Sequence, residues 1–392
     1  MLQNMNGNME EVSSVEIRAL KGLHWQHEKE AKIEEALNSD PVDISTLRSL
    51  AISLGGLVHS RLRKRAWPKL AGVSVFHIPP YKGPPLSDLK DRAQVLLDVN
   101  RCGKRIPKHY SEGRQKLVRD QLTRVILRLL AENSNLHYYQ GLHDVVLTIL
   151  LVTGEDVSYA IMKVIVNHHI RDYLDADMNR TKVVIGHLQS LLVLEDPYLE
   201  QFITRSECAY YFSLSWLITW YGHVVSNQEE SWRLMDLLLA SHPFMSVYLA
   251  AANVLSQRSK ILSLDCEMSA VHGLLSKLPQ DIDYERLIAT ATKLFVKHPP
   301  KSLARQSGMR LSKSSMLSTH STFLHTTAHQ RPDHILKTLP APPTPWVWLT
   351  SPVKYLLSVT APVLVAVLVY VLYEYFTNRT HSSHLDVIAI NR

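Results

Sequence analysis

Cysteine is scarce in this 392-residue chain, and the three cysteines present form no recognisable site. Cys102, Cys208 and Cys266 are odd in number, widely spaced and free of any CxxC pair. This pattern indicates neither a disulfide framework nor a zinc site, so we expect three reduced thiols. Histidine is plentiful, with 20 residues, but no ligand pattern joins them, and the sequence predicts no bound metal.

Phosphate-binding loops are also missing from the sequence. The chain has neither a P-loop (GxxxxGK followed by Ser or Thr) nor the glycine-rich loop of a kinase. Strand-like alternation is nowhere sustained, whereas apolar residues recur at helical spacing over stretches such as 115–130, 142–153 and 209–221. The sequence therefore predicts an all-α protein that has no nucleotide site and no cofactor of its own.

Positive charge is concentrated in one part of the chain. The net charge is +7, and Ser60 to Asp120 alone holds 15 Lys or Arg residues against five Asp or Glu residues. Such a field favours a phosphate-bearing or acidic partner, or a membrane surface. Nucleic acid is one source of phosphates, but this stretch has no interleaved aromatic platform and no zinc finger, so we expect no nucleic-acid partner.

Composition divides the body of the chain into three regions. An N-terminal helical region over 1–56 precedes a helical domain over 57–298, whose two lobes we expect to divide near residue 180. Residues 299–346 are rich in Ser, Thr, His and Pro and contain few large apolar side chains. This composition predicts a disordered, flexible linker.

An apolar segment follows the predicted linker. Tyr355–Phe376 carries no charge before Glu374, so about 19 uncharged residues precede it, against the roughly 20 that a spanning helix needs. We predict a transmembrane helix over 354–376 and a short tail over 377–392, rather than a buried core helix. The first 14 residues lack an apolar run, so we expect no signal peptide but a single-pass tail anchor, with the domain in the cytosol.

The first candidate site residues are Asp98 and Arg101, which lie three residues apart near the end of a predicted helix. Alone, such a pair is most simply a surface ion pair worth a few tenths of a kcal/mol. Gly103 follows closely, however, so Arg101 would project from the helix end while Asp98 holds its guanidinium. A planar fork of donors suits phosphate oxygens.

A glutamine lies at the tip of a predicted loop, where Tyr138, Tyr139, Gln140 and Gly141 follow one another. An amide is no general base at neutral pH, but it can accept from a water while donating to a phosphate oxygen. Gly141 allows the backbone to approach closely. The alternative is an ordinary turn with two packed tyrosines. We expect Gln140 and Arg101 to converge on one point.

Arg63 and Trp67 form an i,i+4 pair in which the guanidinium can lie over the indole face, and we interpret this pair as structural.

Since the chain has no phosphate pocket of its own, Arg101 and Gln140 would act on the phosphates of a partner. Phosphoryl transfer to water needs charge neutralisation and a positioned water, and an arginine supplied in trans can raise the rate about 10³–10⁵-fold.

Three motifs stand in order along the chain: RxxxW at Arg63–Trp67, VxxDxxR at Val95–Arg101 and YxQG at Tyr138–Gly141. Together, over about Leu57 to Lys297, they resemble the TBC domain of Rab GTPase-activating proteins. Val95 stands where that family more often has isoleucine. The resemblance implies an all-α, two-lobed fold and a dual-finger mechanism.

The resemblance also assigns roles to the candidate residues. Arg101 would neutralise charge on the β- and γ-phosphates of a GTP-bound Rab, and Gln140 would position the attacking water. GTP and Mg²⁺ would belong to the Rab. The supporting residues would be Asp98 for Arg101, Arg63 and Trp67 for the fold, and Tyr138 and Gly141 beside Gln140.

With the predicted anchor, the resemblance implies regulation of early secretory (ER-to-Golgi) traffic from the endoplasmic reticulum membrane. Two alternatives remain open. The chain could be a non-catalytic membrane tether that binds a GTP-loaded Rab and recruits partners. More weakly, its positive charge is consistent with a helical scaffold that binds anionic lipid.

Overall fold

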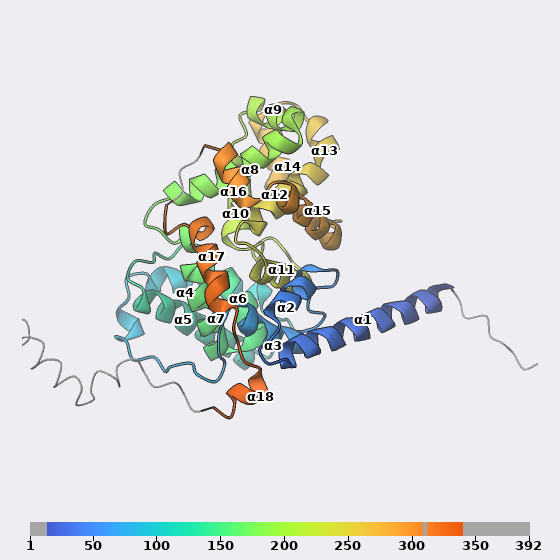
Figure 1. Cartoon of the computed structure of the whole chain (residues 1–392). Coiled ribbons are helices and arrows are strands. Elements are labelled where there is room, and N and C mark those ends of the chain that lie inside the picture. Colours follow the sequence, from blue (N-terminus) through green and yellow to red (C-terminus); the bar gives the residue numbers. More distant parts are fainter. Residues whose placement is uncertain (1–13, 309–311, 340–392) are drawn as a thin grey trace, which may run out of the picture. The chain divides into compact units, whose positions relative to one another are not determined.

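The computed structural model describes residues 14–308 and 312–339, with the side chains of residues 14–23 excepted. Within these ranges every regular element is an α-helix or a short 3₁₀ helix, and no strand occurs there (Figure 1). The prediction of an all-α fold is confirmed for this part of the chain. None of its helices is both long and apolar enough to cross a bilayer. The predicted span over 354–376 and the tail over 377–392 lie outside the described residues.

The first group of elements contains the helices that carry the motifs. Its members are α1 (Ser14–Asn38), α2 (Ile44–Ile52), α3 (Ser60–Leu70), η1 (Leu86–Asp88), α4 (Arg92–Arg101), η2 (Cys102–Arg105), α5 (Glu112–Glu132), α6 (Leu142–Thr153), α7 (Glu155–Asn167) and η3 (Arg171–Tyr173). Helix α6 is apolar and buried over nearly its whole length, and it packs against α3, α4, α5, α7 and α11. The loop before α6 is therefore fixed to the centre of this group.

The helices that follow in the chain form the second group. It comprises α8 (Asn179–Glu195), α9 (Pro197–Arg205), η4 (Tyr210–Ser213), α10 (Leu214–Ile218), α11 (Gln228–Ala240), α12 (Met245–Ser256), α13 (Arg258–Leu262), α14 (Met268–Leu275) and α15 (Tyr284–Lys297). Helix α12 packs against α8 and α15, whereas α11 returns to α2 and α3 of the first group. Figure 1 shows α8, α9, α12 and α15 gathered above α3 to α7.

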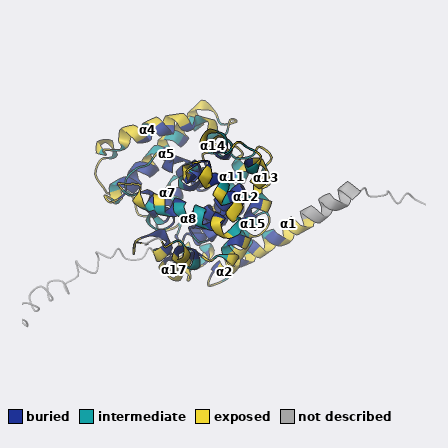
Figure 2. Ribbon diagram, turned by 90° about the horizontal axis from the view of Figure 1, so that it is seen from above, coloured by how far each residue is buried: buried dark blue, intermediate teal, exposed yellow. Residues whose placement is uncertain are grey.

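Helix α4 shows how the apolar pattern positions the site. Val95, Asp98 and Val99 are buried at positions i, i+3 and i+4, whereas Leu97 and Arg101 are exposed. Each buried valine contributes about 1.5–3 kcal/mol through removal of its side chain from water. Figure 2 shows buried residues concentrated on the inner helices and an exposed outer face on α4. The end of α4 is thus anchored while its last side chain faces solvent.

The predicted single helix over 209–221 is wrong. This stretch forms η4 and the short α10, which ends at Ile218. Trp220 and Tyr221 have φ values of 49° and 63°, a left-handed conformation that an α-helix cannot contain. The resulting bend brings the Ile218 carbonyl and Thr219 against the loop before α6.

The predicted disordered linker over 299–346 is also wrong for most of the residues that the structure describes there. Residues 300–306, 316–327 and 333–336 form α16 (Pro300–Gln306), α17 (Met316–Thr327) and α18 (Asp333–Leu336). Phe323 is buried, and the buried Asp172 holds the start of α17 through the Ser315 hydroxyl at 2.7 Å and the Met316 amide at 3.2 Å. A few well-placed apolar side chains anchor a segment whose average composition is polar.

Buried histidines line the contact between α17 and the body of the domain. The rings of His242 and His320 lie 4.5 Å apart, and His169 packs edge-on against Phe323 at 4.8 Å. Burial, aided by the charge of neighbouring groups, lowers the pKa of His242 to about 3 and that of His320 to about 4. Both imidazoles are therefore neutral in the folded protein at mildly acidic pH.

Acidification from pH 7 to pH 5.5 should lower the free energy of unfolding by roughly 2–3 kcal/mol through His242 and His320. In the unfolded chain both rings take up protons near the ordinary pKa of 6.5, so the unfolded state binds more protons as pH falls through this value. Urea unfolding at the two pH values measures the difference. The His320→Leu variant should lose about half of this pH dependence; an unchanged pH dependence would contradict the assignment.

Candidate functional site

Arg101 is the last residue of α4, and its side chain is 62% exposed. The Nη2 of Arg101 lies 3.3 Å from Oδ1 of Asp98, whose side chain is only 1% exposed. The Nε of Arg101 donates to the Leu97 carbonyl at 3.3 Å. The predicted pairing of Asp98 with Arg101 is therefore confirmed. The guanidinium is oriented by a buried carboxylate, yet most of its surface faces solvent.

Asp98 also contacts the loop that carries the glutamine. The Tyr138 hydroxyl donates to its Oδ2 at 2.9 Å, and Gln94 Nε2 donates to its Oδ1 at 3.1 Å. Burial, together with the negative charge of Asp98, raises the pKa of Tyr138 far above its ordinary value of 10. The hydroxyl therefore remains a donor at any working pH. One carboxylate links Arg101 to a residue two positions before Gln140.

Gln140 itself is exposed, and within the described residues its side chain makes no hydrogen bond to the protein. The loop beneath it is tightly held. Tyr139 donates from its hydroxyl to the Ile218 carbonyl at 2.6 Å, and Gly141 has a φ of 122°. A Cβ on Gly141 would lie 2.8 Å from Thr219 Cγ2. Only glycine fits here without strain, and the Gln140 amide is left available to a ligand.

A second buried carboxylate joins the same two segments, and no motif in the sequence predicts it. Asp144, in the first turn of α6, lies 2.6 Å from Nη1 of Arg105 and 3.2 Å from Nδ1 of His223. Burial raises the pKa of Asp144, but the His223 hydrogen bond and the Arg105 charge outweigh this effect and keep the pKa below its ordinary value. Asp144 thus ties the turn after Arg101 to the helix after Gln140. His223 is 79 residues away in the chain, so no local motif reveals the contact.

Arg63 and Trp67 lie together, but not in the predicted way. The recorded cation–π contact of Arg63 is with Trp232, at 5.9 Å, rather than with Trp67. Both residues instead bind Asp236 of α11, Arg63 through Nε at 3.1 Å and Trp67 through Nε1 at 2.8 Å. Asp236 is fully buried and also accepts the Leu57 amide at 2.9 Å. The pair therefore joins α3 to α11, which agrees with a structural role.

Other features of the described residues offer less chemistry. No group of three or more His, Cys, Asp or Glu residues there could hold a metal ion. Burial raises the pKa of Cys102 to about 11, so its thiol is no nucleophile.

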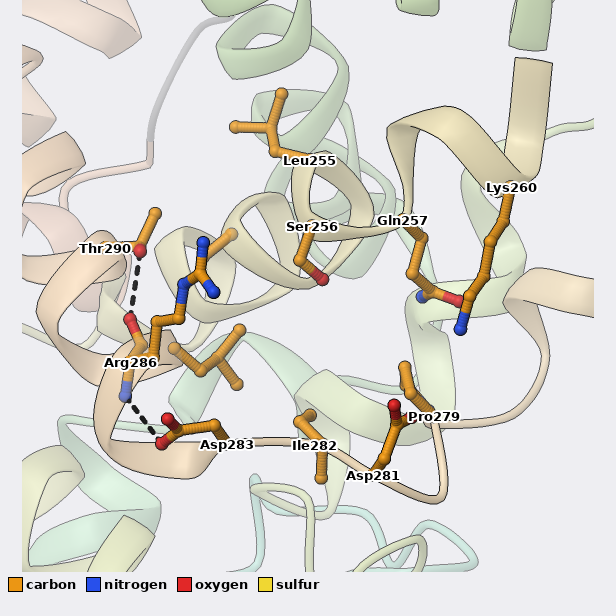
Figure 3. Close-up of a pocket in the computed structure, with 12 residues that line it drawn as sticks. Leu255, Ser256, Gln257, Lys260, Pro279, Asp281, Ile282, Asp283, Arg286 and Thr290 are labelled. Carbon is orange, nitrogen blue, oxygen red and sulfur yellow. Dashed lines mark hydrogen bonds between the residues drawn. The ribbon is translucent and has the colours of Figure 1, made fainter.

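A cavity of about 430 Å³ lies between α12, α13 and α15 (Figure 3). Its two cations, Lys260 and Arg286, are offset by Asp281 and Asp283, and none of its lining residues belongs to α4 or the Gln140 loop.

Comparison with known proteins identifies relatives of the whole domain. The Rab-GTPase-TBC domain family matches residues 60–262, which include all three motifs. The chain is 42% identical over 311 residues to human TBC1 domain family member 20, covering 79% of this chain and 77% of that protein. It is 31% identical over 257 residues to the GTPase-activating protein gyp10 of Schizosaccharomyces pombe, covering 64% and 68%.

A solved structure shares the fold. The crystal structure of the Ypt/Rab-GAP domain of Gyp1p superimposes with a TM-score of 0.54 and 14% sequence identity. The match covers 69% of this chain and 97% of that domain. At this level of identity the likeness extends to the helical architecture alone.

Proposed function

This chain belongs to the family of TBC-domain Rab GTPase-activating proteins, and we propose that it accelerates GTP hydrolysis by supplying Arg101 and Gln140 to a GTP-bound Rab. The observation that carries the proposal is the role of Asp98. This buried carboxylate binds both Arg101 and Tyr138, so one fixed group orients the Arg101 side chain and holds the loop that carries Gln140. GTP and Mg²⁺ belong to the Rab, and the chain contributes no cofactor.

Arg101 supplies positive charge where negative charge develops. Its guanidinium is oriented on one side by Asp98 and retains donors toward solvent, so it can meet phosphate oxygens without a large rearrangement. In the transition state of GTP hydrolysis, negative charge is spread over the transferred phosphoryl group. A pre-oriented arginine stabilises that charge.

Gln140 orients the water that attacks the γ-phosphate. Its amide oxygen accepts a hydrogen bond from the water while its amide nitrogen donates a hydrogen bond to a phosphate oxygen. The bonds of Tyr138 and Tyr139 and the constrained Gly141 fix the backbone below it. Because the backbone is already held, only the side-chain rotamers of Gln140 remain to be ordered in the complex, at a cost of about 0.5–1.5 kcal/mol.

A multiple-turnover GTPase assay with the full-length chain and a panel of Rabs tests this function. Strong acceleration with at least one Rab is expected. The second candidate, a non-catalytic tether, is favoured instead if GTP-loaded Rabs bind without any increase in their hydrolysis rate.

For the cellular setting, we propose a single-pass tail anchor over 354–376 in the endoplasmic reticulum membrane and a role in ER-to-Golgi traffic. The support is the uncharged run in the sequence before Glu374. Protease added to intact microsomes should then digest the helical domain. Full protection of the domain would contradict a cytosolic orientation.

A further inference from the structure

A cavity of about 420 Å³ lies beside the turn that follows Arg101, and we call it the basic pocket. Its walls come from the segment 104–108, from α6, from the residues after Tyr221 and from the start of α11. Lys104, Arg105, Lys108 and His223 all line it, and none of its lining residues is Asp or Glu. The cavity therefore presents cations of several elements to one space.

These cations exceed the negative charge available to them. Arg105 and His223 share one carboxylate, that of the buried Asp144 behind the pocket. Within the part of the chain that the structure describes, the ammonium groups of Lys104 and Lys108 form no ion pair and no hydrogen bond. One carboxylate thus faces three permanent cations, and an anion entering the pocket meets charge that the protein leaves unpaired.

Asp144 also fixes the positions of two cations that line the pocket. Arg105 is 20% exposed and is held by Asp144 at 2.6 Å and by the Thr148 hydroxyl at 3.3 Å. The Nδ1 of His223 is taken by Asp144, so its Nε2 is the nitrogen that remains for a ligand. The same hydrogen bond raises the pKa of His223 and favours its cationic form. Two of the four cations are therefore held in place before any ligand arrives.

The remaining walls combine apolar side chains with the neutral polar residues Thr148, Ser226, Gln228 and Ser231. Ile106, Pro107, Leu151, Val225 and Trp232 line the same cavity as the cations. A pocket of this size with apolar walls and a few polar groups suits a side chain or short segment rather than a simple ion. Its best occupant has an aliphatic or aromatic stem and an anionic end.

We propose that the basic pocket receives an acidic segment of the bound GTPase and so contributes to partner selection. This proposal rests on the proposed function. Lys104 lies three residues after Arg101. A GTPase that brings its phosphates to Arg101 therefore places surface over the pocket. Complementary charge at such a position steers association and discriminates among partners.

The test measures the affinity of the full-length chain for Rabs loaded with a non-hydrolysable GTP analogue. The charge-reversing pair Lys104→Glu and Lys108→Glu should raise Kd about tenfold, which corresponds to about 1.4 kcal/mol, and should weaken the dependence of Kd on salt. The matched control pair, Lys277→Glu and Lys293→Glu, makes the same change of net charge at exposed lysines elsewhere and should leave Kd unchanged.

Equal Kd values for the two pairs would overturn the proposal. A pocket that instead serves a phosphate-bearing ligand would bind inositol hexakisphosphate through Lys104 and Lys108 while Kd for the Rab stays unchanged in the charge-reversed pair. That result also overturns it. If the charge reversal weakens Rab binding but the wild-type chain accelerates no hydrolysis, the pocket assignment stands and the proposed function fails.

Discussion

Replacing Arg101 with alanine is expected to reduce stimulated GTP hydrolysis at least about 10³-fold, because an arginine supplied in trans contributes about 10³–10⁵ to the rate. In energy this is at least about 4 kcal/mol of lost transition-state stabilisation. The measurement is single-turnover hydrolysis by a responsive Rab with this chain in excess over the Rab, which separates the chemical step from product release. A variant that accelerates hydrolysis normally would refute the role.

The structure separates this catalytic loss from a loss of folding. Arg101 is 62% exposed, and Asp98 keeps its bonds from Gln94 and Tyr138 when the guanidinium is removed. The ion pair has one exposed partner, so its contribution to stability is about 0–1 kcal/mol. Thermal unfolding of the Arg101→Ala variant should therefore stay close to that of the wild type.

A lysine at the same position tests the geometry of the charge. Arg101→Lys keeps one positive charge but loses the planar fork of donors, and the shorter ammonium cannot contact Asp98 and a phosphate in the same way. We expect most of the activity to be lost. Full activity in this variant would mean that charge alone is sufficient and that orientation by Asp98 contributes little.

Local spacing explains why half of the site could be predicted from the sequence. Asp98 and Arg101 are three residues apart on one helix, so their contact follows from helix geometry once α4 is assigned. The apolar pattern of α6 likewise predicts Leu142 as its start, which leaves Gln140 in the preceding loop. Such features depend on neighbours in sequence.

Long-range contacts explain what could not be predicted. Trp67 meets Asp236 across 169 residues, and Asp144 meets His223 across 79. Neither acceptor lies in a motif, and many pairings of charged residues are compatible with the same helical pattern. The predicted contact of Arg63 with Trp67 is wrong for this reason. A carboxylate far away in the sequence, that of Asp236, binds the arginine more strongly than the ring four residues away attracts it.

Composition was similarly misleading for the C-terminal part of the domain. The segment around α17 averages as polar, yet Phe323 and Met316 are buried and Asp172 holds the start of the helix. Lys69 is buried as well and binds Asp333 at 2.8 Å. An average over many residues does not register a few contacts of this kind, because their free energy depends on partners elsewhere in the fold.

Gln140→Ala is expected to cost nearly as much as Arg101→Ala, again roughly 10³-fold, because charge stabilisation and water positioning act on the same transition state. The double variant should then be about as slow as the worse single variant rather than slower by the product of the two effects. Single-turnover hydrolysis measures all three.

The exposure of Gln140 makes the comparison of the two single variants with the double variant straightforward to interpret. Its side chain makes no hydrogen bond to the described residues, so alanine removes only what the amide does for a ligand. Gln201→Ala, at an exposed glutamine on α9, is the matched control and should hydrolyse at the wild-type rate. If the two losses multiplied, Arg101 and Gln140 would stabilise the transition state independently of each other. A dependent pair would agree with the common anchor that Asp98 supplies by binding both Arg101 and Tyr138.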